Sequence, residues 1–414
     1  MYRRIAIFAL LVLCSTVAMA QSDSILVVGK DTVAYRYTPM ATSPQKSPKG
    51  GKGWQRFVDY IADSATDQSF ERKVDMTFVP TLYYSPSTSA GLAVMMAGLY
   101  RLDKQNRSIP ASDFSVYATA SLTGFYRVGI KGNNIFRNDR RRIIYNAEFF
   151  SQPTSFWGVG YDSAMSNGSM RYLASRTIVD VRFLQRVAKG LFVGVGADFN
   201  YHFGKFGGSK YASESDFITR LGDNGVNYNA TGISLFVEFD TRDVISNPQR
   251  GVYVGVQAKV RPRGMNSVGH TLWSGRLSAN FYQKLWKGAV LALDLRGELN
   301  SKETPWVYNA TLGGLSSMRG YYAGRFNDLC ALTLQAELRQ NIYKGLGGAV
   351  WGGAGNVFGS FRNFAWHEIL PTYGVGLRYG VKRNMTIRFD YGFGSRDHRG
   401  KLIHGAVFSF NEAF

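Results

Sequence analysis

The sequence predicts an all-β protein, a transmembrane antiparallel β-barrel of about 16 strands. Three observations carry this prediction: an N-terminal export signal in a chain without an apolar spanning helix, segments in which apolar and polar residues alternate, and an aromatic residue at the C-terminus. The composition agrees, because aromatic residues reach 14% and glycines number 46 among 414 residues. An exported chain with this composition is either a soluble β-protein or an outer-membrane barrel.

The first twenty residues have the pattern of a secretory signal peptide. Arg3 and Arg4 form a basic start, residues 5–13 form an apolar run, and residues 18–20 read Ala-Met-Ala, a small-residue cleavage pattern. Two alternatives are a genuine N-terminal helix and lipidation at Cys14, which the leucine directly before that cysteine disfavours. We expect export, with a mature chain that begins after residue 20.

Export limits what the charges and the cysteines can do. Without residues 1–20 the net charge falls from +20 to +18, because two arginines and no acidic residues are lost. After export this excess favours contacts with anionic lipid headgroups, a basic lumen or solvated loops, and no nucleic-acid partner is expected. Only Cys330 remains, so no internal disulfide is expected. No later stretch approaches eighteen consecutive apolar residues, which argues against a spanning helix.

Residues 21–73 form a separate segment before the predicted barrel at 74–414. The stretch SPQKSPKGGKG at 43–53 is polar and rich in Pro, Lys and Gly, so we expect it to be disordered. A short amphipathic helix is predicted over about 53–67, where the apolar residues recur at helical spacing: Trp54, Phe57, Tyr60 and Ile61. This helix would rest on the periplasmic rim of the barrel, or would act as a plug or partner contact.

The strands are predicted from alternation with a period of two, the periodicity of a β-strand. In residues 331–339, ALTLQAELR, the leucines and Ala336 share one face, whereas the polar and charged residues share the other. Similar alternation occurs at 233–240, 252–260, 291–299 and 385–393. A sandwich core would not accept unpaired charges of both signs, but a membrane barrel turns its apolar face to lipid and its polar face to the lumen. A soluble sheet with one wet face is the alternative.

Sixteen segments have this character, an even number as single-chain bacterial barrels require. We place them near 74–85, 89–102, 113–130, 141–150, 154–164, 173–187, 189–204, 229–240, 250–263, 270–285, 289–300, 329–343, 346–357, 370–380, 383–394 and 403–414. Connections such as 287–288 are short, whereas those at 204–229, 263–270, 301–328 and 357–370 are long, as periplasmic turns and outer loops would be. The last strand ends at Phe414, which suits the membrane interface and looks like the C-terminal signal by which outer-membrane barrels are recognised for assembly.

No motif for catalysis or cofactor binding is present. The chain lacks G-x-S-x-G, H-E-x-x-H and G-x-x-x-x-G-K-[ST], and its five histidines are scattered. Asp397 and His398 are the nearest candidates for a catalytic pair at the barrel rim, but adjacent residues on a strand point to opposite faces. We therefore expect no enzymatic activity, no cofactor and no metal.

One glycine- and tyrosine-rich stretch, LGGLSSMRGYYAGRFND at 312–328, interrupts the alternation. Within it, Met318-Arg319-Gly320-Tyr321 resembles the [VIM]-R-G-[FY] signature in the sixth extracellular loop of the BamA/TamA-type assembly and translocation barrels, also called the bacterial surface antigen family. Other motifs resemble that family in the same order: Asp240, Arg242 and Asp243 with Pro248 and Gly251, then AELR at 336–339, GNV at 355–357 and RFDYG at 388–392. The resemblance covers residues from about 230 to 414.

The resemblance implies that this long loop folds into the lumen and that Arg319 docks on acidic residues of the wall. Physical chemistry agrees, because a buried charge without a partner costs several kcal/mol. The alternation places Glu337 and Asp390 on the inward face, where they could pair with a guanidinium. Gly320 would let the backbone fold tightly, and the two tyrosines after it could pack on the wall. A solvated loop with an incidental arginine is the alternative.

The sequence departs from the family in two ways. Gly353 stands where many members carry an aspartate, so one expected anionic partner of the arginine is missing. The family normally carries periplasmic POTRA domains, and the residues before the first predicted strand are too few for one. We therefore expect a short member without them.

The resemblance implies a role in the insertion, assembly or translocation of proteins at the bacterial outer membrane. The expected partners are outer-membrane lipid and lipopolysaccharide, together with unfolded outer-membrane proteins or accessory assembly subunits. A passive pore or structural barrel is the alternative. An embedded hydrolase would need a catalytic triad at the rim, which the sequence does not offer.

Overall fold

The computed structural model describes residues 69–410, except for 86–88, 105–108, 110, 123, 167–168, 206–225, 244–246, 315–316, 344–345 and 383–384. The expected signal peptide (1–20), polar stretch (43–53) and amphipathic helix (53–67), as well as Phe414, lie outside the described residues. In the part of the chain that is described, no helix is long and apolar enough to cross a membrane.

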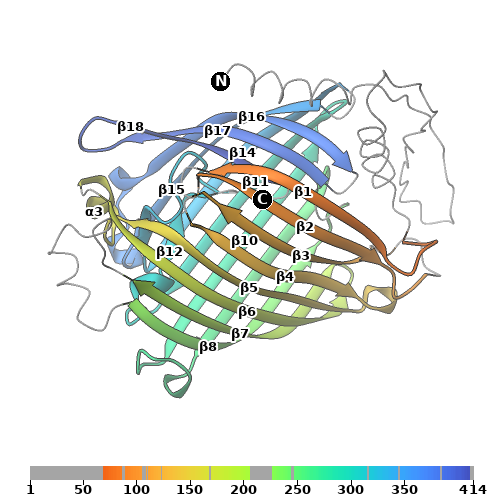
Figure 1. Ribbon diagram of the computed structural model, residues 1–414, viewed down its shortest axis with the longest axis horizontal. Coiled ribbons are helices and arrows are strands. Elements are labelled where there is room, and N and C mark those ends of the chain that lie inside the picture. Colours follow the sequence, from red (N-terminus) through yellow and green to blue (C-terminus); the bar gives the residue numbers. More distant parts are fainter. Residues whose placement is uncertain are drawn as a thin grey trace.

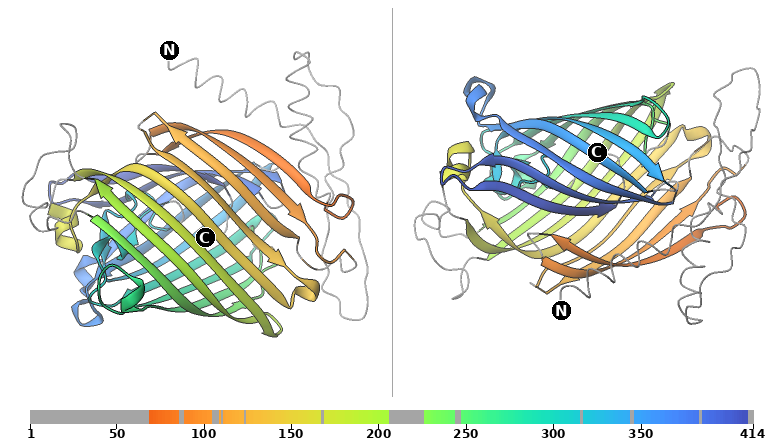
Figure 2. Two further views of the ribbon diagram at one scale, coloured as in Figure 1. Left: turned by 60° about the horizontal axis from the view of Figure 1, so that its bottom comes forward. Right: turned by 90° about the horizontal axis from the view of Figure 1, so that it is seen from above.

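Sixteen strands form one antiparallel sheet that curls into a barrel (Figures 1 and 2). In chain order they are β1 (Asp75–Ser85), β2 (Ser89–Tyr100), β3 (Ser112–Ser121), β4 (Tyr126–Ile135), β5 (Arg141–Phe156), β6 (Met170–Ala188), β7 (Leu191–Lys205), β8 (Val226–Asp240), β9 (Gly251–Arg261), β10 (Leu272–Lys284), β11 (Ala289–Asn300), β14 (Cys330–Tyr343), β15 (Leu346–Phe358), β16 (Leu370–Lys382), β17 (Met385–Arg396) and β18 (Leu402–Phe410). Each pairs with the next, so the order in the sheet is the order in the chain. The predicted all-β class and the strand number are confirmed.

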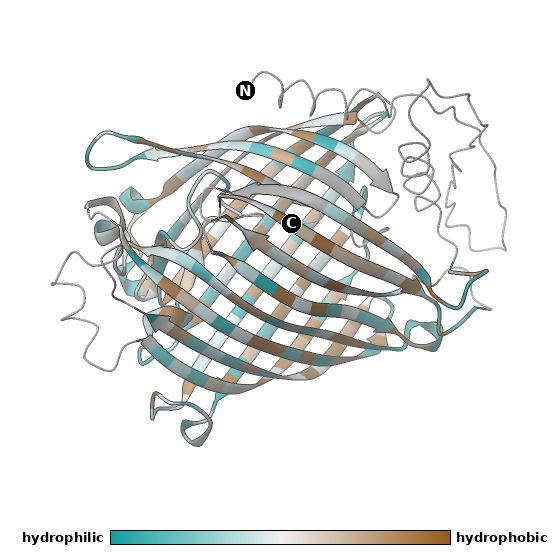
Figure 3. Cartoon of the chain, in the orientation of Figure 1, coloured by the Kyte–Doolittle hydropathy of each residue, from teal (hydrophilic) through white to brown (hydrophobic). Residues whose placement is uncertain are grey.

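The two faces of the sheet differ as the alternation predicted. Along β8 the exposed residues are Ile233, Leu235, Val237 and Phe239, and the buried residues between them are Ser234, Phe236 and Glu238. Brown apolar positions alternate with teal polar ones on the strands of Figure 3. Large apolar side chains on the outside of a sheet that buries charged ones inside are stable where the outside meets lipid.

Two strand predictions were wrong, and their errors cancel in the total. The segment predicted at 113–130 is two strands, β3 and β4, because a turn with Gly124 at φ +83° separates them. The segments predicted at 141–150 and 154–164 are instead one long strand, β5, followed by the helix α3 (Tyr161–Ser166). Pro153 lies within β5, beyond the last residue that β4 pairs with, and it pairs only with Leu173 of β6. One side of β5 is an edge there, where proline is tolerated.

The two ends of the barrel carry different connections. At one end the strands are joined by long segments, which include residues 157–169, 301–329 and 359–369. At the other end most turns are short, as at 189–190 and 285–288. The connections 101–111 and 241–250 at that second end are longer than the other turns there. We call these ends the long-loop end and the short-turn end.

A small hydrophobic core lies inside the barrel near the long-loop end. It joins α3, the hairpin of β12 (Ala310–Leu312) and β13 (Phe326–Asp328) within the long loop, and the inner face of the last strands. Its buried members are Ala164, Met165, Ala310, Leu312, Met318, Tyr321, Phe326, Ala331, Val357, Leu370 and Ile403. We call this group the plug core. It fixes the loop 301–329 to the wall through apolar contacts that water cannot reach.

The first and last strands meet along a seam. Strands β1 and β18 lie close together over part of their length (Figure 1). Within the described residues no β-ladder joins them, whereas all other neighbouring strands of the sheet are paired. The seam is therefore the weakest line along the wall.

Replacing an outward-facing leucine tests which face meets lipid. Leu334 lies on β14 and is 56% exposed. We expect Leu334→Arg to reduce the stability of the barrel in a bilayer by about 2–4 kcal/mol, because it places a charge in hydrocarbon. Urea titration in lipid vesicles, followed by heat-modifiable gel mobility, measures this. The control Leu334→Ile should behave as the unaltered protein, and equal stability of the arginine variant would refute the assignment of the faces.

Candidate functional site: the docked lumenal arginine

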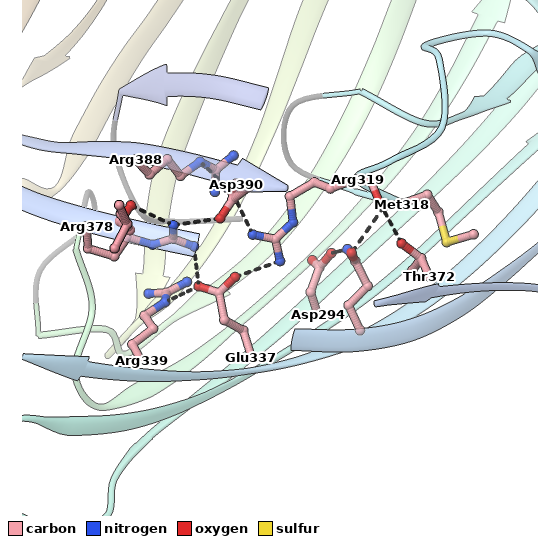
Figure 4. Close-up of polar contacts among 11 residues, drawn as sticks. Asp294, Met318, Arg319, Glu337, Arg339, Thr372, Arg378, Arg388 and Asp390 are labelled. Atoms are coloured by element: carbon pink, nitrogen blue, oxygen red, sulfur yellow. Dashed lines mark hydrogen bonds and ion pairs between the residues drawn. The ribbon is translucent and has the colours of Figure 1, made fainter. Parts of the chain in front are cut away.

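The long loop carries Arg319 to the inner wall of the barrel. The loop joins β11 to β14, the eleventh and twelfth strands of the sheet, and the β12–β13 hairpin holds its two arms together. Arg319 lies between those arms and is completely buried. Figure 4 shows its side chain directed at the wall formed by β14, β16 and β17.

Two carboxylates of the wall bind the Arg319 guanidinium. Its Nη2 lies 2.6 Å from Glu337 Oε2, and its Nη1 lies 3.0 Å from Asp390 Oδ2, with all three side chains shielded from solvent. The guanidinium carbon also lies 4.1 Å from the centre of the Trp351 ring, a cation–π contact. The structure thus brings together the three residues that the sequence singled out for this interaction. Charge-assisted contacts of this kind are strong where water is absent.

Three further arginines surround the same carboxylates. Arg339 Nε lies 2.7 Å from Glu337 Oε1, and Arg378 reaches both carboxylates, at 2.6 Å from Asp390 Oδ1 and 3.3 Å from Glu337 Oε1. Arg388 Nε lies 3.8 Å from Asp390 Oδ2. Four guanidiniums therefore share two carboxylates, and each carboxylate is held from several directions (Figure 4). We call these six residues the arginine network.

Glycines on the wall let the loop backbone lie directly on the strands. A Cβ atom at Gly392 of β17 would come within 2.5 Å of the Arg319 carbonyl oxygen. Gly320 has φ +106°, and a Cβ there would come within 2.7 Å of the Gly392 carbonyl carbon. A left-handed backbone at this contact distance requires glycine. The Thr372 hydroxyl donates a 2.7 Å hydrogen bond to the same Arg319 carbonyl and fixes its direction.

The neighbours of Arg319 in the signature dock on either side of it. The Met318 N–H donates to Gln335 Oε1 at 3.1 Å, and the Met318 side chain belongs to the plug core. The Tyr321 hydroxyl donates to the Pro371 carbonyl at 2.6 Å and accepts from the Ser395 N–H at 2.7 Å. Burial raises the pKa of Tyr321, which keeps the hydroxyl protonated as a donor. The whole signature, Met318 to Tyr321, is held by the wall.

Gly353, the departure from the family pattern, has a local explanation. It lies opposite Gln335 in the β14–β15 ladder, and a Cβ at this position would come within 2.6 Å of Gln335 Cγ. Gln335 is the side chain that accepts from Met318, and its amide in turn donates to Asp294 Oδ2 at 3.4 Å. Glycine at 353 leaves room for Gln335, and Arg319 docks without a third carboxylate.

Sequence reasoning missed several members of the site. Arg378, Trp351, Gln335, Thr372 and Asp294 were not singled out. The alternation alone would have placed Arg378 on the inward face of its strand, the face that also carries Gly376 and Gly374. Which inward residues meet the loop depends on the register between strands and on the path of the loop, and neither is visible in one sequence.

The upstream family motif forms a turn at the short-turn end, away from Arg319. Asp240 accepts from Nε and Nη2 of Arg242, both at 2.9 Å, and Arg242 lies 4.5 Å from the Tyr253 ring centre. Asp243 Oδ1 accepts from the N–H groups of residues 249 and 250, after the buried Pro248. Gly251 has φ +114°, and a Cβ there would come within 2.5 Å of the Thr241 carbonyl oxygen. These residues shape the β8–β9 connection.

The loop has a second anchor on another part of the wall. The Tyr308 hydroxyl donates to the carbonyl of Tyr228 at 3.1 Å and lies 3.3 Å from that of Asn200. The Trp306 ring packs on Phe156 with ring centres 4.1 Å apart. The loop therefore reaches from the β5–β8 wall to the β14–β17 wall, across the lumen.

The arginine network holds both of its carboxylates in ion pairs. Within the described residues, no three His, Cys, Asp or Glu side chains are grouped so that they could hold a metal ion. The arginine network offers no free carboxylate to act as a base, because guanidiniums hold both Glu337 and Asp390. The arrangement is suited to holding a loop in one position.

A sixteen-stranded barrel with apolar residues outside, and an arginine-bearing loop docked inside, defines a class of outer-membrane β-barrel protein. An Omp85 superfamily domain model matches residues 126–414, more than half of the chain, and the chain belongs to this superfamily. The bacterial surface antigen resemblance seen in the sequence is confirmed by this match. A search of curated proteins finds no match.

Two solved structures show the same fold. BamA from Haemophilus ducreyi lacking POTRA domains 1–3 superposes with a TM-score of 0.54 at 11% identity, over 82% of this chain and 70% of that one. CdiB from Acinetobacter baumannii superposes with a TM-score of 0.52 at 14% identity, over 83% of this chain. The chain spans 60% of the length of that CdiB chain. At these identities the likeness concerns the fold.

Removing the buried guanidinium tests the arginine network. We expect Arg319→Ala to lower the free energy of unfolding by about 3–5 kcal/mol, because it leaves buried carboxylates without their central partner. Urea unfolding in vesicles, monitored by tryptophan fluorescence, measures the change. Arg276→Ala removes a more exposed pair with Glu298 and should cost less than about 1 kcal/mol. Equal effects of the two substitutions would contradict the assigned role of Arg319.

A pair of glycine substitutions tests the close contact of the loop with the wall. Gly392→Ala should push the Arg319 backbone off β17 and expose the loop to added protease, because its methyl group would overlap the Arg319 carbonyl. Gly352→Ala on β15 is the matched control, because the nearest atom to its Cβ is 3.9 Å away. Cleavage within 301–329 is expected for the first variant only. Full resistance of both would show that the wall accommodates a side chain at residue 392.

Proposed function

We propose that this barrel takes part in inserting or translocating proteins at the bacterial outer membrane, and that the seam between β1 and β18 is where it acts. The observation that carries the proposal is the seam itself, the one place in the described sheet where neighbouring strands are not paired. Membership in the Omp85 superfamily and the fold shared with BamA and CdiB support it.

Unpaired strand edges explain how such a barrel could act. An edge strand presents a row of backbone N–H and C=O groups that can pair with another chain. In β-strand addition these groups bind an extended segment of the partner and supply most of the affinity through main-chain hydrogen bonds. An incoming strand that pairs with β1 would begin to fold at the membrane without exposing its own backbone to lipid.

The docked loop would keep the rest of the wall in place while the seam is open. Arg319 ties the loop to β14 and β17, and Thr372 and Tyr321 tie it to β16. These contacts lie on the C-terminal side of the seam. We infer that the C-terminal strands form the fixed side against which a substrate strand is positioned.

The plug core favours this role over that of a passive pore. It occupies the lumen near the long-loop end with buried apolar side chains from α3, the β12–β13 hairpin and the wall. Free diffusion would need an open path through that region. Pore or structural roles remain the alternative that the experiments below distinguish.

The proposed partners follow from the two surfaces of the barrel. The outer surface exposes leucine, valine and aromatic side chains, which suit outer-membrane lipid and the acyl chains of lipopolysaccharide. The seam would accept unfolded outer-membrane proteins, and accessory assembly subunits would bind at the rims.

Locking the seam tests the proposal. Cysteines introduced where β1 and β18 approach each other can be joined by a disulfide across the seam in a Cys330→Ser background. The disulfide-locked protein in vesicles should accelerate the folding of an unfolded barrel substrate no more than empty vesicles do. A reductant should restore the acceleration. Full activity in the locked state would refute the seam mechanism.

Conductance measurements separate the two functional classes. In planar bilayers we expect little steady current from the unaltered barrel, and an increase on Arg319→Ala, because the loop then leaves the wall. A large, size-selective conductance that is the same with and without Arg319 would favour the passive pore.

A further inference from the structure

A second cluster of charged side chains lines the lumen on strands β6, β7 and β9, apart from the arginine network. Lys259 Nζ lies 2.6 Å from Asp198 Oδ1, and Arg261 Nη2 lies 3.2 Å from Asp198 Oδ2. Arg176 Nη2 donates to Asn200 Oδ1 at 3.0 Å, and Asn200 Nδ2 donates to Asp198 Oδ2 at 2.9 Å. Two cations thus pair with Asp198, and a third, Arg176, is linked to that carboxylate through Asn200.

The loop covers this cluster. The Tyr308 ring lies against both arginines, with its centre 5.7 Å from the Arg176 guanidinium carbon and 5.5 Å from that of Arg261. Its hydroxyl is bound to the wall, as described above. The side chains of Lys259 and Arg261 are each 11% exposed, so the cluster still reaches the lumen at its margin.

Neighbouring acidic groups do not balance the charge. Glu148 of β5 attracts Arg176, but it also pairs with Arg127 at 3.8 Å and accepts from the Tyr117 hydroxyl. Asp180, opposite Asp198 in the ladder, pairs with Arg182 at 3.7 Å. When these pairs are included, the cluster still has two more cations than carboxylates.

Several polar nitrogens in the cluster lack acceptors. Among the residues that the structure describes, Arg176 Nε, Arg261 Nε and both ring nitrogens of His202 have no hydrogen-bond partner. His202 is only 5% exposed and lies directly opposite Arg176 in the β6–β7 ladder. Both side chains point inward, so His202 faces the same group of cations. Buried donors without acceptors are costly, and an anion would satisfy them.

We propose that this cluster, Arg176, His202, Lys259 and Arg261, is a binding site for a phosphate group. A doubly charged oxyanion would cancel the excess charge, and its several oxygens would accept from the two Nε–H groups and from one imidazole N–H. Guanidinium groups suit phosphate because they present parallel donors. The phosphate would also fix Tyr308 between the arginines and so strengthen the second anchor of the loop.

Phosphate binding can be measured on the full barrel in detergent. Isothermal titration calorimetry with inorganic phosphate, in a buffer free of other oxyanions, should show saturable binding that sodium chloride at equal ionic strength does not reproduce. His202→Phe keeps a ring and removes both nitrogens, and Arg176→Gln removes a charge. Each should weaken binding on the order of tenfold, the effect of losing one charge-assisted contact.

Two further variants distinguish a loss of specific phosphate contacts from a damaged fold. Asp198→Asn removes the central negative charge, so it should tighten phosphate binding, an effect opposite in sign to that of a damaged fold. Arg142→Gln removes a lumenal guanidinium that pairs with Asp139 at the short-turn end and should leave binding unchanged. Heat-modifiable gel mobility checks that each variant is folded.

A competition experiment distinguishes a lipid headgroup from free phosphate as the ligand. Displacement of bound inorganic phosphate by short-chain phosphatidic acid would show that a lipid headgroup reaches the site, and absence of displacement would assign the site to free phosphate. The proposal fails if the unaltered protein binds phosphate no better than chloride, or if Asp198→Asn and His202→Phe bind it as the unaltered protein does.

Discussion

The ion pairs of Arg319 with Glu337 and Asp390 are the constraint on which the interior of this barrel depends. A loop of about thirty residues, 301–329, would lose much conformational entropy on docking. The burial of a guanidinium between two carboxylates, in a place without water, supplies a strong and directional contact to offset that loss. The plug core, the Thr372 hydrogen bond and the Tyr321 contacts then follow from the position of the arginine.

The arginine network also shows why a buried charge is stable here. One guanidinium and one carboxylate in an apolar core often gain less from attraction than they lose in hydration. In this barrel the carboxylates are shared among Arg319, Arg339, Arg378 and Arg388, so each carboxylate is held by more than one cation. The glycines of the facing strands allow the loop backbone to come close enough for these contacts.

Most strands of the barrel could be predicted from the sequence because successive side chains of a strand point to opposite faces of the sheet. Alternation along 331–339 and 385–393 identified both the strands and their inward residues, which is how Glu337 and Asp390 could be named before the structure. Boundaries were less visible: one turn at Gly124 was missed, and Pro153 lies inside a strand because β5 has a free edge there.

The members of the site that could not be predicted depend on three-dimensional neighbours. The Gln335 side chain needs the space that is free because residue 353 is a glycine. The two residues face each other only because of the β14–β15 register. The second anchor at Tyr308 depends on where the loop crosses the lumen. Local sequence patterns do not predict that path.

The path of the loop has a mechanical consequence for the barrel. Its anchors at Trp306 and Tyr308 lie on β5 to β8, and its anchors at Arg319 and Tyr321 lie on β14 to β17, so the loop resists any widening that would separate those two arcs. All of these contacts lie outside the first four strands. In the proposed mechanism the seam would therefore separate by a hinge motion of that N-terminal hairpin pair, with the cross-section of the remaining arc unchanged.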